Sequence, residues 1–360
     1  MAQSGYDFAV FGSTVFARLL AGLLAGVHGK RVCLVGERWS PYRLPRRIDV
    51  SVAPISRPAT WALLQREVPE ALKVFGGIGR GLYERVDPLF VAETPETIAF
   101  LGHMRWMALG FGFAAEPAVD QTITSAGRIC RIRDAARLVN ARAAPAFDAW
   151  LDKIGIGWLQ PGDTALSLKR DGSASITTGT LTVEAETVIL ADDEAILDRM
   201  SPSDRHRLIA VSEATALMIE PVAALPASLI TYLDRETAVL QRNARSPVTA
   251  IASGDPNTAV ARLAASIPTR ETLRQTGQTI FRTIVTADGA PLIGRMGRGR
   301  AMVIAGLGPV AAFLAPAVAQ VVVDQAPTEV ADYFAGREPS RGASRGDVAE
   351  LPARVEEPAT

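Results

Sequence analysis

The chain has 360 residues and a mass of 38.3 kDa, enough for two domains or for one large α/β domain with an insertion. Its 48% hydrophobic and 21% charged residues are typical of a globular protein, and its 38 basic residues equal its 38 acidic ones. This balance argues against a dedicated nucleic-acid binder, which usually has a basic excess.

Only four of the basic residues are lysine, and this arginine bias in an alanine-rich chain indicates a bacterial genome of high GC content. Cys33 and Cys130 fit neither a metal-binding spacing nor a disulfide framework, which favours a reducing compartment. The apolar stretch Phe8–Val27 contains Arg18 and lacks a basic segment before it, so we predict no secretion signal. Glycines and prolines interrupt Ala301–Val323, so we predict no membrane span and a cytoplasmic protein.

The chain opens with a strand, a helix and a second strand within about thirty residues. Tyr6–Phe11 is a β-rich run, Ser13–Val27 has apolar residues at helical spacing, and Val32–Val35 is the next strand. This is the dinucleotide-binding unit, in which a phosphate lies at the helix N-terminus. Glu37 follows the second strand, where an acidic residue accepts hydrogen bonds from a ribose.

The glycine fingerprint of this unit is incomplete. Gly12 keeps the first glycine of G-x-G-x-x-G, and Ala17 is an acceptable third residue. Thr14 replaces the second glycine, which normally lets the backbone approach the pyrophosphate. The window therefore leaves two interpretations open: a nucleotide site, or a βαβ unit that folds without a nucleotide.

A basic loop, residues 38–47, follows Glu37. One interpretation is that Arg46 or Arg47 neutralises a diphosphate and compensates for Thr14. The other is a solvated loop, since charge runs are usually solvent-exposed.

The most informative stretch comes late in the chain. Asp288–Gly294 is a turn into a short apolar segment, and Met302–Ala305 is a buried strand. The turn Gly306-Leu307-Gly308 leads into an apolar helix over Pro309–Asp324, where Pro309 suits the first helical turn. The backbone amides near Val310 would form a second positive helix end that faces the ligand of the first unit.

These features, in this order, resemble the D-amino-acid oxidase/glycine oxidase (DAO) family of FAD-dependent oxidoreductases, and the resemblance runs nearly end to end. It implies an α/β, two-domain fold in which a doubly wound, Rossmann-like FAD domain is interleaved with an antiparallel β-sheet substrate or cap domain. It assigns residues 1–50, 126–200 and 283–335 to the FAD domain, and 51–125 and 201–282 to the substrate domain. Few large apolar residues follow Gly336, so we expect a disordered tail over 336–360.

The resemblance further implies FAD as the cofactor, a small amine or amino acid as the substrate, and oxidation of a C–N bond by hydride transfer to the flavin. No metal is expected. Arg282 precedes the late turn and is the candidate for pairing with a substrate carboxylate, or it is a surface residue at a strand end. The expected cofactor-binding residues are Gly12, Ser13, Thr14, Ala17, Glu37, Arg46, Arg47, Ala191, Gly306, Gly308, Pro309 and Val310.

The residues after Ala191 depart from the family pattern, which has a glycine next to the cofactor. Asp192 and Asp193 stand here instead, and two carboxylates repel a pyrophosphate unless they face solvent or an arginine. Two alternatives to the amine oxidase therefore stay open. One is a flavin-free structural or regulatory subunit, and the other is a flavoenzyme that acts on a partner protein or another substrate. A second protein subunit is compatible with each, and a nucleic-acid partner is not expected.

Overall fold

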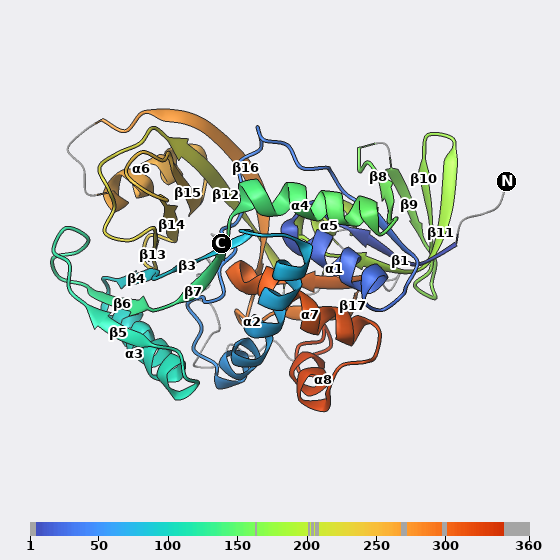
Figure 1. Cartoon of the computed structure of the whole chain (residues 1–360), viewed down its shortest axis with the longest axis horizontal. Helices are drawn as coiled ribbons and strands as arrows, with labels where there is room; N and C mark the ends of the chain where they lie inside the picture. The colour runs from blue at the N-terminus through green and yellow to red at the C-terminus, as the bar shows by residue number, and fades with distance from the viewer. Residues whose placement is uncertain are drawn as a thin grey trace.

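A computed structural model describes residues 5–162, 164–200, 202, 205, 209–267, 272–296 and 301–341. Its two large β-sheets form separate layers, each with its own helices (Figure 1). The first sheet lies on the right of the view with α1, α4 and α7, and the second lies on the left with α3 and α6. The expected mixed α/β fold with two interleaved sheets is confirmed.

The first sheet has the strand order β17-β18-β11-β1-β2-β8, and a hairpin of β9 and β10 extends from β11. Its central strands β18, β11, β1, β2 and β8 run parallel, whereas β17 is antiparallel to β18. The strands are β1 (Gly5–Phe11), β2 (Val32–Val35), β8 (Gly157–Leu159), β9 (Thr164–Leu168), β10 (Ala174–Thr178), β11 (Leu181–Leu190), β17 (Leu292–Met296) and β18 (Ala301–Ala305).

Both faces of this sheet are buried, as is usual for parallel strands. On one face, Val10 and Ile189 pack beneath a helical layer that also holds the largest core of the protein. On the other face, Phe11 and Leu190 pack beneath the β9–β10 hairpin and α5. The helices of this half are α1 (Val15–Gly26), α2 (Pro58–Ile78), α4 (Asn140–Lys153), α5 (Asp193–Arg199), the 3₁₀ turn η2 (Gly308–Val310), α7 (Ala311–Val322) and α8 (Thr328–Ala335).

The second sheet has the order β16-β12-β15-β14-β13-β4-β6-β5 and is antiparallel except where β13 meets β4. Two long strands, β12 and β16, pair along almost their whole length. The strands are β4 (Leu89–Ala92), β5 (Ala115–Ala118), β6 (Arg128–Ile132), β12 (Ile209–Ile219), β13 (Leu229–Tyr232), β14 (Thr237–Leu240), β15 (Val248–Ser253) and β16 (Gln275–Thr286), with helices α3 (Pro95–Gly110) and α6 (Pro256–Ser266).

The structure divides two segments differently from the boundaries expected from the sequence. The segment 126–200 was assigned to the FAD domain, but its first strand, β6, pairs with β4 and β5 in the second sheet. The next strand, β7 (Ala135–Leu138), forms a small separate sheet with β3 (Tyr83–Val86). In the segment 51–125, α2 packs against α7 in the core of the first half. The chain therefore crosses between the halves near residue 139, later than expected.

The expected tail begins with an ordered segment, residues 336–341. The Arg341 side chain is largely buried and forms a two-pronged ion pair with Asp288, at 2.9 Å from Nε to Oδ2 and 3.0 Å from Nη2 to Oδ1. It also donates to the carbonyls of Ala290 and Pro291. Composition alone predicted disorder here because it does not show that a single arginine fits a buried carboxylate. Residues 342–360 lie outside the described part of the chain.

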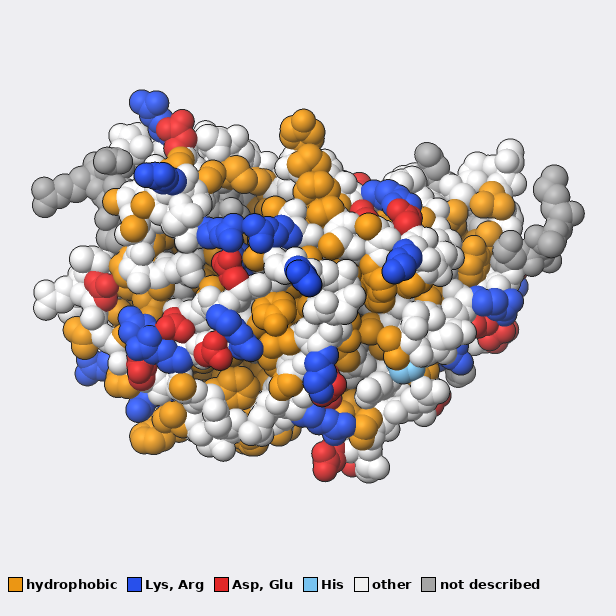
Figure 2. All heavy atoms as spheres, in the orientation of Figure 1, with side chains coloured by type: hydrophobic (Ala, Val, Ile, Leu, Met, Phe, Trp, Pro, Cys, Tyr) orange, Lys and Arg blue, Asp and Glu red, His pale blue; other side chains and the backbone are white. Residues whose placement is uncertain are grey.

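The visible surface carries basic side chains that are dispersed, several with an acidic side chain beside them (Figure 2). This pattern agrees with the many arginine–carboxylate ion pairs and with the balanced charge of the sequence. Among the described residues, no helix is both long and apolar enough to cross a membrane, and no cluster of three or more His, Cys, Asp or Glu side chains is arranged to hold a metal.

Candidate functional site

The candidate site lies at one edge of the first sheet. Because β1, β2, β11 and β18 are parallel, their carboxyl ends meet at this edge. The edge therefore brings together Gly12 after β1, Glu37 after β2, Ala191 after β11 and Gly306 after β18. In open α/β sheets, ligands bind in the crevice outside these strand ends.

The glycines after the first two strands permit a close backbone approach. A Cβ atom on Gly36 would lie 2.1 Å from the carbonyl oxygen of Gly12, so only glycine fits there. A Cβ atom on Gly12 would lie 2.8 Å from the Cβ of Ala17. Ala17 is therefore the small third residue that the fingerprint requires, and this turn has kept the geometry of a dinucleotide-binding unit.

Thr14 has a role that its place in the fingerprint did not predict. It is the N-cap of α1, and its hydroxyl accepts a hydrogen bond from the Ala17 amide at 3.3 Å. The amides of Thr14, Val15 and Phe16 donate to no group in the described part of the chain. The start of a buried helix thus keeps backbone donors that need an acceptor, which suits a phosphate oxygen.

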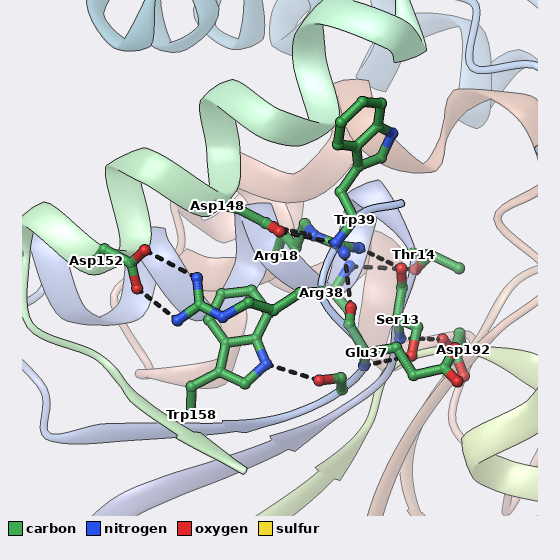
Figure 3. Close-up of polar contacts among 12 residues, drawn as sticks. Ser13, Thr14, Arg18, Glu37, Arg38, Trp39, Asp148, Asp152, Trp158 and Asp192 are labelled. Atoms are coloured by element: carbon green, nitrogen blue, oxygen red, sulfur yellow. Dashed lines mark hydrogen bonds and ion pairs between the residues drawn. The ribbon is translucent and has the colours of Figure 1, made fainter. Parts of the chain in front are cut away.

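Asp192 takes the remaining amide at this helix start (Figure 3). Its Oδ2 accepts from the Ser13 amide at 2.6 Å, and its Oδ1 accepts from the Ala195 amide at 2.9 Å. One carboxylate therefore bridges the starts of α1 and α5. Burial raises the pKa of Asp192, the two amides act in the opposite direction, and the nearby Asp193 and Glu194 carboxylates raise it further.

Arg18 is a buried cation beside the same turn, and sequence reasoning assigned it no role in the site (Figure 3). Its Nε donates to Asp148 of α4 at 2.6 Å, and its Nη2 donates to the Glu37 carbonyl at 2.7 Å. A third hydrogen bond joins its Nη1 to the Ser13 carbonyl. The guanidinium thus fastens the glycine turn, the end of β2 and α4 to one another. A lone charge in an apolar helical stretch was the signal that could have identified it.

The side chains after β2 are paired with one another and with α5. The Glu37 carboxylate, which is partly exposed, forms an ion pair with Arg43. Arg46 pairs with Glu194 at the start of α5. Arg47 lies 3.5 Å from the buried Asp49. The loop is not a free solvated segment, since Leu44 also packs against the second sheet.

The second predicted helix end begins with a 3₁₀ turn, and its α-helix starts later than the sequence indicated. Gly308, Pro309 and Val310 form the 3₁₀ turn η2, and α7 begins at Ala311. The Pro309 carbonyl accepts a hydrogen bond from the Val50 amide at 3.0 Å, which ties this turn to the segment after β2. A cavity of about 10 Å³ lies here between residues 53–60, 289–291 and 306–314. This cavity is about the size of one water molecule.

Arg282 lies on β16 and is about half exposed. Its guanidinium forms an ion pair with Asp198 of α5. A substrate carboxylate would therefore have to displace Asp198. The assignment of Arg282 to the substrate stays a prediction.

The residues at the strand edge fit the ADP half of FAD at three places: the glycine-only turn, the free amides at the start of α1, and the exposed carboxylate of Glu37. The Ser13 amide differs, because the chain's own carboxylate occupies it. A diphosphate on the free amides of α1 would therefore lie beside the Asp192 carboxylate.

A scan against models of protein families finds no match, and a search of curated proteins finds no similar sequence. Solved structures do resemble the chain. L-proline dehydrogenase from P. horikoshii is 14% identical with a TM-score of 0.72, and the match covers 94% of this chain and 97% of that one. Glycine oxidase from Geobacillus kaustophilus is 15% identical with a TM-score of 0.70, covering 89% and 94%.

Iminodiacetate oxidase from Chelativorans sp. BNC1 is 15% identical with a TM-score of 0.67, covering 89% of this chain and 96% of that chain. These matches define the chain as a two-domain protein with the fold of amino-acid oxidases and dehydrogenases. The fold predicted from the resemblance to the D-amino-acid oxidase/glycine oxidase family is thereby confirmed over nearly the whole chain.

Proposed function

We propose that this protein is an FAD-dependent oxidoreductase that oxidises the C–N bond of an amino acid or a secondary amine. The observation that carries the proposal is the end-to-end likeness of fold to solved amino-acid dehydrogenases and oxidases. The glycine turn, the free α1 amides and Glu37, all at one sheet edge, support the proposal.

Each part of the edge has a task in this proposal. The amides of Thr14, Val15 and Phe16 bind the diphosphate, because a helix start favours negative charge. The Glu37 carboxylate accepts hydrogen bonds from ribose hydroxyls, which replace its ion pair with Arg43. The backbone amides of η2 and α7, near Gly308, stabilise the negative charge that a flavin gains on reduction. FAD, when bound, supplies the redox chemistry by accepting a hydride from the carbon that bears the nitrogen.

We further infer a cytoplasmic, bacterial protein whose ligand is a small amine or amino acid. Both cysteines are free and buried, which suits a reducing compartment, and the arginine-rich, alanine-rich composition suits a bacterial genome of high GC content. Arg282 remains the candidate for the substrate carboxylate, and a second protein subunit remains compatible with the fold.

The absorption spectrum of the purified protein tests this function. We expect a yellow protein, or one that becomes yellow when FAD is added, with a flavin band that bleaches under a substrate amine. A correctly folded protein that stays colourless and takes up no FAD would contradict the proposal and support the flavin-free subunit. Bound FAD with no bleaching by amino acids, sarcosine or opines would indicate a flavoenzyme with another substrate.

A further inference from the structure

Asp192 stands where an anion would bind at the start of α1. Its carboxylate holds the Ser13 amide at 2.6 Å and the Ala195 amide at 2.9 Å, so each oxygen serves one helix start. The neighbouring Asp193 points elsewhere, because its Oδ2 accepts from the Thr283 hydroxyl at 2.7 Å and from the Ile284 amide at 3.0 Å. Asp192 contacts the turn that follows β1 (Figure 3), whereas the contacts of Asp193 are with β16.

We propose that Asp192 is a proton-linked gate of the diphosphate site: a dinucleotide binds when Asp192 is protonated, and the charged carboxylate competes with it for the Ser13 amide. The gate deepens the proposed function and rests on it. A protonated carboxyl group is a hydrogen-bond donor and can serve a phosphate oxygen. A charged carboxylate is only an acceptor and repels the phosphate.

The charges around Asp192 make this protonation accessible. From α5, the Asp193 and Glu194 carboxylates are like charges near it. The neighbouring cations have other partners: Arg46 from the loop after β2 pairs with Glu194, and Arg18 from α1 pairs with Asp148.

Two further ion pairs belong to these segments in the described part of the chain, Glu37 with Arg43 and, between β16 and α5, Arg282 with Asp198. In the described part of the chain, no cation contacts the Asp192 carboxylate, whose pKa is raised by burial. A diphosphate beside it would raise this pKa further, because like charges disfavour the charged form. Binding therefore takes up a proton.

The test is a titration of the full-length protein, stripped of any bound flavin, with FAD between pH 5 and 9, followed by quenching of flavin fluorescence. For the wild type we expect the affinity to fall with rising pH, by at most about tenfold per pH unit. Asp192→Asn keeps the shape and removes the charge, so it should bind FAD about tenfold or more tightly at pH 8 and lose most of this pH dependence.

Asp193→Asn is the matched control, because it removes a neighbouring charge that does not contact Ser13. It should keep a fall in affinity with rising pH, shifted to lower pH because the Asp193 carboxylate no longer raises the pKa of Asp192. Calorimetry in two buffers with different ionisation enthalpies should show proton uptake with the wild type and little with Asp192→Asn. Circular dichroism of each variant checks the fold.

The failures of the two proposals are distinct. If neither the wild type nor Asp192→Asn binds FAD at any pH while both are folded, the proposed function fails. If the wild type binds FAD with no pH dependence, or if Asp192→Asn binds like the wild type at every pH, FAD binding stands and the gate is refuted. If Asp192→Asn unfolds, proton uptake by the wild type decides, and its absence refutes the gate.

Discussion

The buried guanidinium of Arg18 joins three parts of the site. Its side chain is 4% exposed, that of Asp148 is 12% exposed, and both Asp148 oxygens are used, since Oδ2 accepts from the Trp39 amide at 2.8 Å. A buried ion pair adds little net stability, but removing one partner leaves the other charge unpaired and is costly. Arg18 therefore fixes the position of the glycine turn relative to α4 and the end of β2.

We expect Arg18→Met to lower the free energy of unfolding by about 3–5 kcal/mol, since it strands the buried Asp148 carboxylate. Arg38→Met is the matched control, because Arg38 pairs with Asp152 at the surface, where the loss is about 0–1 kcal/mol. Urea unfolding at neutral pH measures both. If both substitutions lowered the free energy of unfolding equally, the Arg18–Asp148 pair would contribute no more than a surface ion pair.

At the scale of elements, the link between β18 and α7 has a backbone conformation that favours glycine. Gly308 has φ +56°, in the left-handed region that β-branched residues rarely adopt. Gly308→Val would therefore strain the fold as well as any contact with a cofactor.

We therefore expect Gly308→Val to lower the stability of the protein by about 1–2 kcal/mol. Gly308→Asn tolerates this backbone conformation and adds a side chain at the cofactor edge, so it should weaken FAD binding with a smaller change in Tm. Thermal unfolding and flavin content, measured on both variants, separate the two effects. Unchanged flavin content in Gly308→Asn would show that this turn does not approach the cofactor.

Local patterns were sufficient to predict the βαβ start and the late strand, turn and helix, because apolar spacing and glycine positions are written in consecutive residues. They did not assign β6 to the correct sheet, since the five residues Arg128–Ile132 show no regular alternation that would indicate their partners. The Arg18–Asp148 contact joins positions 130 residues apart and follows only from the packing of α1 on α4. Asp192 was noticed as a misplaced carboxylate, but its acceptor role needed the parallel pairing of β1 with β11.

At the scale of the whole molecule, Arg341, which follows α8, fixes a loop at the edge of the first sheet. Arg341 forms an ion pair with Asp288 and donates to the carbonyls of Ala290 and Pro291, so it supports the loop that borders Gly306. Both partners are largely buried, with side chains 11% and 6% exposed. Removing one partner of this buried ion pair should therefore destabilise the fold strongly.

We expect Arg341→Ala to destabilise the protein by about 3–5 kcal/mol through the stranded Asp288 carboxylate. Arg341→Lys keeps the charge but not the two-pronged geometry, so its effect should be intermediate. Tm and resistance to proteolysis in the 286–294 segment are the measurements. An Arg341→Ala protein as stable as the wild type would mean that the contact contributes nothing.

The order of strands in the first sheet has a consequence for how the protein is made. During synthesis β1 and α1 are made before their partners, because β1 pairs with β11 and the apolar face of α1 packs against α7. The second sheet is complete at Thr286, before the residues of α7 are made. The face of α1 that packs against α7 therefore stays uncovered until synthesis has passed Val322, whereas the face that packs against α4 can be covered once Lys153 has been made.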